Sequence, residues 1–266
     1  MGSDADVFIF DYEAYLTEVV PAFLALFRDN QIAEWLQPFL KRREIKPELW
    51  DRADLARFDG PLKPGLSWPG PYDLEYVYDD DWPKRWSTLK GNSTLNDAPS
   101  DELAEQINWL FKIAVSIKSL GASQFVGRSY TVSHYVKTLF ELGVKADDRI
   151  TTLLAALGKR GFIIGYQFGF GFEGINGWLD ATETAELARR LELLPLPDYE
   201  VSFEAMEQFR MPNTGQYEFP DFGFEELSLS FVRTTASIAA AENRGLLWGN
   251  GVMPAEFYLE RYRGAR

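Results

Sequence analysis

The stretch from Gly161 to Asp180, GFIIGYQFGFGFEGINGWLD, constrains the fold of this chain more than any other. Large apolar residues occupy alternate positions from Phe162 to Phe172, and mostly small residues lie between them. Because a strand sends successive side chains to opposite faces, this pattern predicts a strand with one bulky face and one flat face. The bulky face is expected in a core, and the flat face would let a helix, another backbone or a ligand approach closely. Ile175–Leu179 is the predicted partner strand of a glycine-rich hairpin near 161–179.

Helical periodicity of apolar residues dominates most of the remaining chain. The spacing predicts helices over 15–27, 32–40, 101–120, 132–142, 148–157, 181–191 and 224–241, and a short helix after Pro254. Pro21 predicts a kink in the first helix or a start near Thr17. Residues 7–11 indicate a buried strand or a first helical turn, and 201–203 a strand; Gly121 and Gly245 are expected to end helices. The mixture predicts an α+β fold, amphipathic helices packed on a small sheet.

The local composition along the chain predicts a single globular domain over 1–266 with three parts. Residues 1–58 form a helical N-terminal part, 59–99 an irregular aromatic segment and 100–266 an α+β core. In 59–99, proline and glycine alternate with tryptophan and tyrosine. The aromatic content favours a packed, functional segment over a linker.

The composition excludes several kinds of chemistry. The chain has 0 cysteines and 1 histidine, so thiolate nucleophiles, disulfides and histidine-rich metal sites are ruled out, and we expect no metal and no cofactor. The absence of cysteine fits a reducing compartment. The N-terminus carries aspartates where a secretory signal carries lysine or arginine, and no apolar run is long enough for a membrane span. These features predict a cytoplasmic protein without membrane contact.

The segment 147–190 resembles a winged helix in outline, with a helix, a hairpin and a second helix opened by an acidic cap. The resemblance implies DNA binding through lysine and arginine on the recognition helix and wing. Residues 161–180 contain neither residue type, and the whole chain has a net charge of −13. Without cations there is no counterion release to drive binding to DNA. We therefore expect no nucleic acid partner.

The N-terminal VFIFDYEAYL resembles the phosphotransferase signature of haloacid-dehalogenase-like enzymes, in which Asp11 would be the nucleophile. The sequence departs from that signature at each further position. Glu13 stands where the second aspartate is found, and Ala14 and Tyr15 replace the glycine and threonine. The general acid and the tight turn that the signature implies are therefore missing, and an ordinary strand or helix start is the simpler interpretation.

Three residues are candidates for catalysis: Glu173, Asp180 and His134. The first two lie around the turn and exit of the predicted hairpin, beside Tyr166, where paired carboxylates near an aromatic wall suit general acid–base chemistry. Asp180 followed by Glu183 is also typical of a helix cap. His134 is the lone histidine of a predicted helix, and the chain has no G-x-S-x-G motif. The sequence favours a protein that is not an enzyme.

Candidate binding residues combine acidic and aromatic side chains, because carboxylates attract a basic partner and aromatic residues anchor interfaces. Residues 1–100 carry 18 acids and 11 bases, and 196–266 carry 11 and 6, whereas the middle is nearly neutral. Calcium loops place a glycine at the turn, which the aspartate run lacks. The candidates are Asp79, Asp80, Asp81, Trp82, Trp86, Tyr166 and Asn176.

The leading hypothesis is a non-enzymatic cytosolic interaction protein, of immunity or inhibitor type, that binds a basic protein. The alternative is a small-molecule enzyme or binder with a pocket between the glycine-rich strand and the 59–99 segment. The C-terminal part resembles small bacterial cytosolic proteins in its sequence pattern, a glycine-rich hairpin and WLDATETAELARRL followed by LPLP. This resemblance implies no function.

Overall fold

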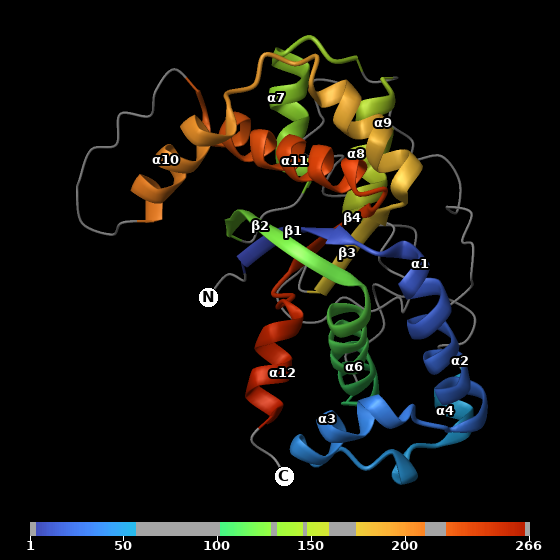
Figure 1. Ribbon diagram of the computed structural model, residues 1–266. Helices are drawn as coiled ribbons and strands as arrows, with labels where there is room; N and C mark the ends of the chain where they lie inside the picture. The colour runs from blue at the N-terminus through green and yellow to red at the C-terminus, as the bar shows by residue number, and fades with distance from the viewer. Residues whose placement is uncertain are drawn as a thin grey trace.

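The architecture is a small antiparallel sheet with helices on both faces (Figure 1). The structure is a computed structural model of the chain. It describes residues 4–56, 102–128, 132–145, 148–159, 174–210 and 222–263. These residues form a four-stranded sheet in the order β2-β1-β4-β3. The strands are β1 (Asp4–Phe10), β2 (Leu120–Arg128), β3 (Gly174–Leu179) and β4 (Gly245–Asn250). The predicted α+β class is confirmed.

The central strand β1 divides the core into two apolar clusters. It pairs antiparallel with β2 on one side and with β4 on the other. Val7 and Ile9 point into one cluster, whereas Phe8 and Phe10 point into the other. Both faces of the strand are therefore buried, which explains why VFIF is a continuous apolar run and does not alternate with polar residues.

The first helical layer covers the face of Phe8 and Phe10, and is drawn below the sheet in Figure 1. Its longest helix, α6 (Glu102–Ser119), runs directly into β2. The layer contains α1 (Tyr12–Ala14), the π-helical η1 (Tyr15–Val19), α2 (Val20–Asp29), η2 (Glu34–Leu36), α3 (Gln37–Arg42), η3 (Pro47–Leu49), α4 (Arg52–Ala56), α6 (Glu102–Ser119) and α12 (Ala255–Arg263).

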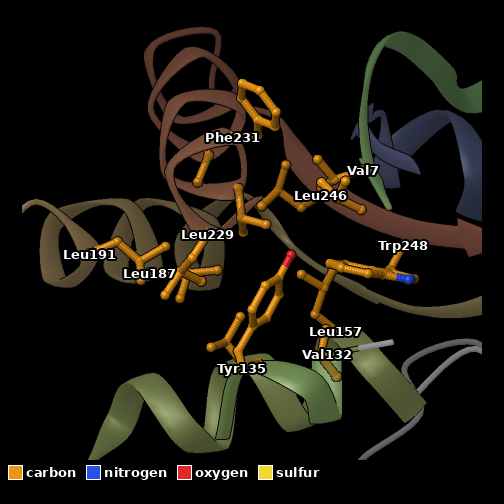
Figure 2. Packing of buried hydrophobic residues seen from close by; sticks show 14 of the residues in the cluster. Val7, Val132, Tyr135, Leu157, Leu187, Leu191, Leu229, Phe231, Leu246 and Trp248 are labelled. Atoms are coloured by element: carbon orange, nitrogen blue, oxygen red, sulfur yellow. The ribbon is translucent and has the colours of Figure 1, made fainter. Parts of the chain in front are cut away.

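The second helical layer covers the face of Val7 and Ile9. It contains η5 (Val132–His134), α7 (Tyr135–Glu141), α8 (Arg149–Lys159), α9 (Ala181–Leu191), α10 (Tyr199–Arg210) and α11 (Phe224–Ala241). Figure 2 shows its interior, where the Tyr135 ring lies near Trp248. The two rings meet edge to face at 5.9 Å. The Tyr135 hydroxyl lies 2.6 Å from Ser228 Oγ, which donates to the carbonyl of Val126, so α7, α11 and β2 are tied together.

The N-terminal helix changes its geometry immediately before Pro21. The backbone N–H of Val20 donates to the carbonyl of Tyr15, five residues back, and α2 then begins with the proline in its first turn. A proline cannot donate to the carbonyl four residues back and its ring collides with that carbonyl, so the wider π turn accommodates it. The chain is helical from Tyr12 to Asp29, and the π turn takes the place of the predicted kink or start at Thr17.

Three sequence predictions about strands need correction or extension. Gly121 and Gly245 do follow helices. Gly121 lies in β2 and Gly245 in β4, two strands that were not predicted from the sequence. The predicted strand at 201–203 is wrong, because these residues lie inside α10. Ile175–Leu179 is confirmed as a strand, β3, and among the described residues it pairs with β4. The predicted first arm of the hairpin lies outside the described residues.

Gly177 brings helix α8 into direct contact with the backbone of β3. A Cβ atom at this position would collide with the carbonyl oxygens of Ala156 and Leu157. Neither oxygen can move without moving the helix, so only a glycine fits here. The flat face that the sequence predicts between Phe162 and Phe172 lies outside the described residues, and Gly177 in β3 shows the same kind of close approach.

We expect Gly177→Ala to lower the free energy of unfolding by about 2–3 kcal/mol, because the added methyl forces α8 away from the sheet. Urea denaturation is the measurement. Gly121→Ala is the matched control, since its Cβ would meet Ile9 Cβ at an ordinary 3.4 Å, and it should change stability by less than about 0.5 kcal/mol. Equal effects of the two substitutions would contradict the close-approach explanation.

An ion-pair network joins α8 to α9. Glu186 accepts from Arg149 Nε at 3.1 Å and from Arg190 Nε at 3.0 Å, and Arg190 also contacts Asp148 at 3.3 Å. Partial burial alone would raise the pKa of the Glu186 carboxyl. The hydrogen bonds and charges of the two arginines outweigh burial and lower this pKa.

The lowered pKa of Glu186 predicts a contribution to stability that depends on pH. A carboxyl whose pKa is lower in the folded than in the unfolded state stabilises the fold above its unfolded pKa of about 4.3, and this contribution disappears as the pH falls through the folded pKa. Glu186→Gln should therefore lower the melting temperature at about pH 7 and have little effect at about pH 3. A pH-independent effect would show that lost packing, and not charge, is responsible.

Candidate functional site

Most of the binding residues predicted from sequence lie outside the described residues. This holds for Asp79, Asp80, Asp81, Trp82 and Trp86, and equally for Tyr166 and Glu173. Both walls of the alternative pocket, the 59–99 segment and the glycine-rich strand, are also outside. The described candidates are Asn176, Asp180 and His134, and their positions decide what each can do.

Asn176 belongs to a buried amide pair at one end of the sheet. Its Nδ2 donates to Oδ1 of Asn250 at 3.1 Å, and the same oxygen accepts from Trp248 Nε1 at 3.0 Å. Asn176 is 3% exposed and Asn250 1%. Buried amides need such partners because an unpaired polar group in the core is costly. These contacts join β3 to β4 and do not present Asn176 to a ligand.

Asp180 is a helix cap. Its Oδ1 accepts from the backbone N–H of Glu183 at 2.8 Å, and the Glu183 carboxylate accepts from the Asp180 backbone N–H at 3.1 Å. This reciprocal capping box opens α9, as its sequence pattern predicted. Asn176 and Asp180 are four residues apart along β3, which places them roughly 13 Å apart at ~3.3 Å per residue. They cannot share one reaction centre.

We expect Asp180→Ala to lower stability by about 1 kcal/mol, because the first turn of α9 loses a side-chain acceptor. Asp180→Ser should retain most of that stability, since a serine hydroxyl can accept from the same N–H. Thermal denaturation followed by circular dichroism measures both. If the serine variant is as unstable as the alanine variant, the stabilisation by Asp180 does not come from capping.

The remaining catalytic candidate among the described residues is His134, and two buried tyrosines are also titratable. His134 is exposed at the entrance to α7. Tyr15 and Tyr135 lie in the two cores, where burial raises the pKa of each phenol well above its usual range, so both stay protonated. Within the described ranges, no group of three or more histidine, aspartate or glutamate side chains is placed to hold a metal ion.

Asp11 also has a structural role. One carboxylate oxygen accepts from the backbone N–H of Ala14 at 2.9 Å, and the other forms an ion pair with Arg244. The carboxylate thus caps the start of α1 and ties it to the residue that precedes β4. A nucleophile needs a free oxygen facing a substrate, and both oxygens of Asp11 are engaged in these contacts.

The described residues do contain a surface of the predicted chemistry, on α10. We define the acidic aromatic surface as Tyr199, Glu200, Phe203, Glu204 and Glu207. Phe203 is 45% exposed, and Glu200 and Glu204 are exposed beside it. Residues 198–210 contain four acidic side chains and one basic one, a net charge of −3. Figure 1 shows α10 at the periphery, beyond one end of α11.

Helical spacing explains why rings and carboxylates share the outer side of α10. Ser202, Ala205 and Met206 are buried, so they define the inner face. Tyr199 and Phe203 are four residues apart and form a stacked pair, with ring centroids 6.0 Å apart and planes at 21°. Glu200 and Glu204 follow each ring by one position, which places them farther from the inner face.

The start of α10 is held firmly against the core. The carbonyl of Pro197 accepts from Ser230 Oγ and from Arg233 Nη2, both at 2.7 Å. The Tyr199 ring meets Phe231 edge to face at 5.5 Å, and its hydroxyl donates to Gln124 Oε1 on β2 at 3.1 Å. The Tyr199 ring is therefore fixed in place, and a binding partner loses little entropy in ordering it.

This arrangement suits the side chains of lysine and arginine. Their methylene stems pack on aromatic rings, their charges interact with the ring faces, and carboxylates around the rings pair with the cationic ends. An exposed carboxylate pair alone contributes little. The fixed rings supply the apolar contact that carboxylates lack.

Sequence reasoning missed this surface because it assigned 201–203 to a strand. The β-branched and aromatic residues of VSF favour a strand when they are considered alone. A wider window contains the helical signal. Pro197 and Asp198 are typical of a helix start, Glu200 suits its first turn, and Ser202, Ala205 and Met206 recur at i, i+3 and i+4.

Comparisons with protein-family models, curated proteins and solved structures find no match to this chain. Among the described helices, none is long and apolar enough to cross a membrane.

Proposed function

We propose that the protein is a non-enzymatic interaction protein that binds a basic protein partner through the acidic aromatic surface of α10. The observation that carries the proposal is the stacked Tyr199–Phe203 pair, half-open to solvent and bordered by carboxylates. Exposed aromatic residues on a rigid element are typical anchors of interfaces, and surrounding acids select a basic partner and speed its association.

The roles of three described candidate residues support a binding protein. Asp180, Asp11 and Asn176 are each engaged in capping, ion pairing or core hydrogen bonds. An immunity or inhibitor protein fits this chemistry, because such a protein neutralises a basic target by covering it and needs no reacting group. In this proposal the protein works in the cytoplasm, the compartment that the absence of cysteine suggests.

The test is selection of peptides from a displayed library of random sequences on the full-length protein. We expect enrichment of peptides rich in lysine or arginine together with apolar residues. A selected peptide should bind the double variant Glu200→Gln/Glu204→Gln about five- to tenfold more weakly than the wild type at low salt, and the difference should shrink as salt screens the charges. Fluorescence anisotropy with the labelled peptide measures both.

The matched control is Glu256→Gln/Glu260→Gln on α12, which removes two exposed carboxylates at the same spacing. This variant should bind the peptide as the wild type does. Equal weakening by both double variants would show general attraction to an acidic protein and contradict a specific surface. Phe203→Ala should weaken binding in high salt as well, because its contribution is apolar.

A further inference from the structure

We infer that the acidic aromatic surface takes arginine side chains of its basic partner in preference to lysine side chains. The inference rests on the proposed function and specifies which residue of the partner makes the contact. It combines two observations on α10: an exposed ring in a nearly parallel stack, and two exposed carboxylates beside that ring that have no cationic partner among the described residues.

The exposed ring is that of Phe203. Its side chain is 45% exposed, and the Tyr199 ring stacks against it with planes at 21°. Tyr199 is held by Phe231 and Gln124, so it forms a fixed support behind the exposed ring. A guanidinium group is planar, weakly hydrated and stacks on aromatic faces, whereas an ammonium group is a compact and strongly hydrated charge. A flat cation can therefore extend the stack.

Helical spacing places two carboxylates around this ring. Glu200 precedes Phe203 by three positions and Glu204 follows Glu200 by four, and residues at these spacings are neighbours on a helix surface. Both side chains are exposed, and neither carboxylate has an ion-pair or hydrogen-bond partner in the part of the chain that the structure describes. Like charges four residues apart repel each other. A cation that contacts both carboxylates relieves this repulsion.

Arg190 shows how one guanidinium group serves two carboxylates in this chain. Its Nε donates to Glu186 Oε1 at 3.0 Å, and its Nη1 donates to Asp148 Oδ1 at 3.3 Å. The donors of a guanidinium group lie in one rigid plane and point in different directions, so they reach acids on separate segments. The carboxylates of α10 offer a second pair of acids, with an aromatic ring beside them.

Lys118 shows the contrasting arrangement of a lysine at an aromatic ring. Its ammonium nitrogen lies 5.0 Å from the centroid of the Trp35 ring and 2.6 Å from Glu18 Oε2. One ring and one carboxylate suffice for this compact charge. An ammonium group has no planar face, so it cannot stack on a ring while donating to two acids from the edge of one plane. The ring and paired carboxylates of α10 therefore match arginine better than lysine.

The experiment compares three labelled peptides of equal length on the full chain. Glycine alternates with arginine in the first, with lysine in the second and with dimethylated arginine in the third, so all three carry the same charge. Methylation keeps the charge of arginine but blocks bidentate hydrogen bonding. We expect the arginine peptide to bind about five- to tenfold more tightly than either of the others in anisotropy titrations.

Variants of Phe203 test whether the preference comes from the ring. Phe203→Leu keeps an apolar side chain but removes the flat face, and should reduce the preference for arginine over lysine to less than about twofold. Phe203→Tyr keeps the ring and should retain the preference. Melting temperatures show that both variants fold. Glu256→Gln/Glu260→Gln on α12 is the control that should leave the preference unchanged.

The outcomes separate this inference from the proposed function. If the arginine and lysine peptides bind equally and Glu200→Gln/Glu204→Gln weakens both, the preference for arginine is wrong and binding of a basic partner stands. Tighter binding of the lysine peptide overturns the inference in the same way. A preference for arginine that persists undiminished in Phe203→Leu also overturns it, because the ring is then not its source. If none of the peptides binds, both proposals fail.

Discussion

The fold depends on the burial of β1 on both of its faces. Val7 and Ile9 enter one cluster and Phe8 and Phe10 the other, so a single strand contributes to both cores. An antiparallel sheet can leave one face in water, and here helices cover both. The Gly177 backbone allows α8 to close on the second face without an intervening side chain. Every other strand is positioned by its register relative to β1 and β4.

Local signals in the sequence predicted most helices well, with α10 as an exception, and predicted the sheet poorly. The Asp180–Glu183 capping box, the stripe from Leu103 to Leu120 and Gly143 at a positive φ were readable because each acts within a few residues. β2 and β4 were missed because each directly follows a long helix, at Gly121 and Gly245, and glycine after a helix is the usual sign of its end. Whether such a glycine enters a sheet depends on strands more than a hundred residues away, as the pairing of Phe10 with Gly245 illustrates.

The predicted site at 79–86 lies outside the described residues and stays a prediction. Acidic and aromatic side chains together were expected at 79–86, and among the described residues that combination occurs on α10. A polar residue beside glycines, such as Asn176, has the sequence pattern of a binding site. The same amide side chain can contact a ligand or form a hydrogen bond within the core. Burial distinguishes the two roles. The Asn176 amide is 3% exposed and hydrogen-bonded to Asn250, so it joins two strands. Sequence alone does not give burial at a strand end.

The contacts between α10 and the rest of the fold hold the acidic aromatic surface in a defined position. A free acidic helix would attract any cation and select none, because exposed ion pairs are weak and tolerant of geometry. The contacts of Tyr199 with Phe231 and Gln124 fix its ring relative to the edge of β2. In the proposed function, a basic partner would meet rings and carboxylates whose positions are set by these contacts. Each contact is modest alone, and under the proposed function the spacing of rings and carboxylates would let the surface distinguish one basic protein from another.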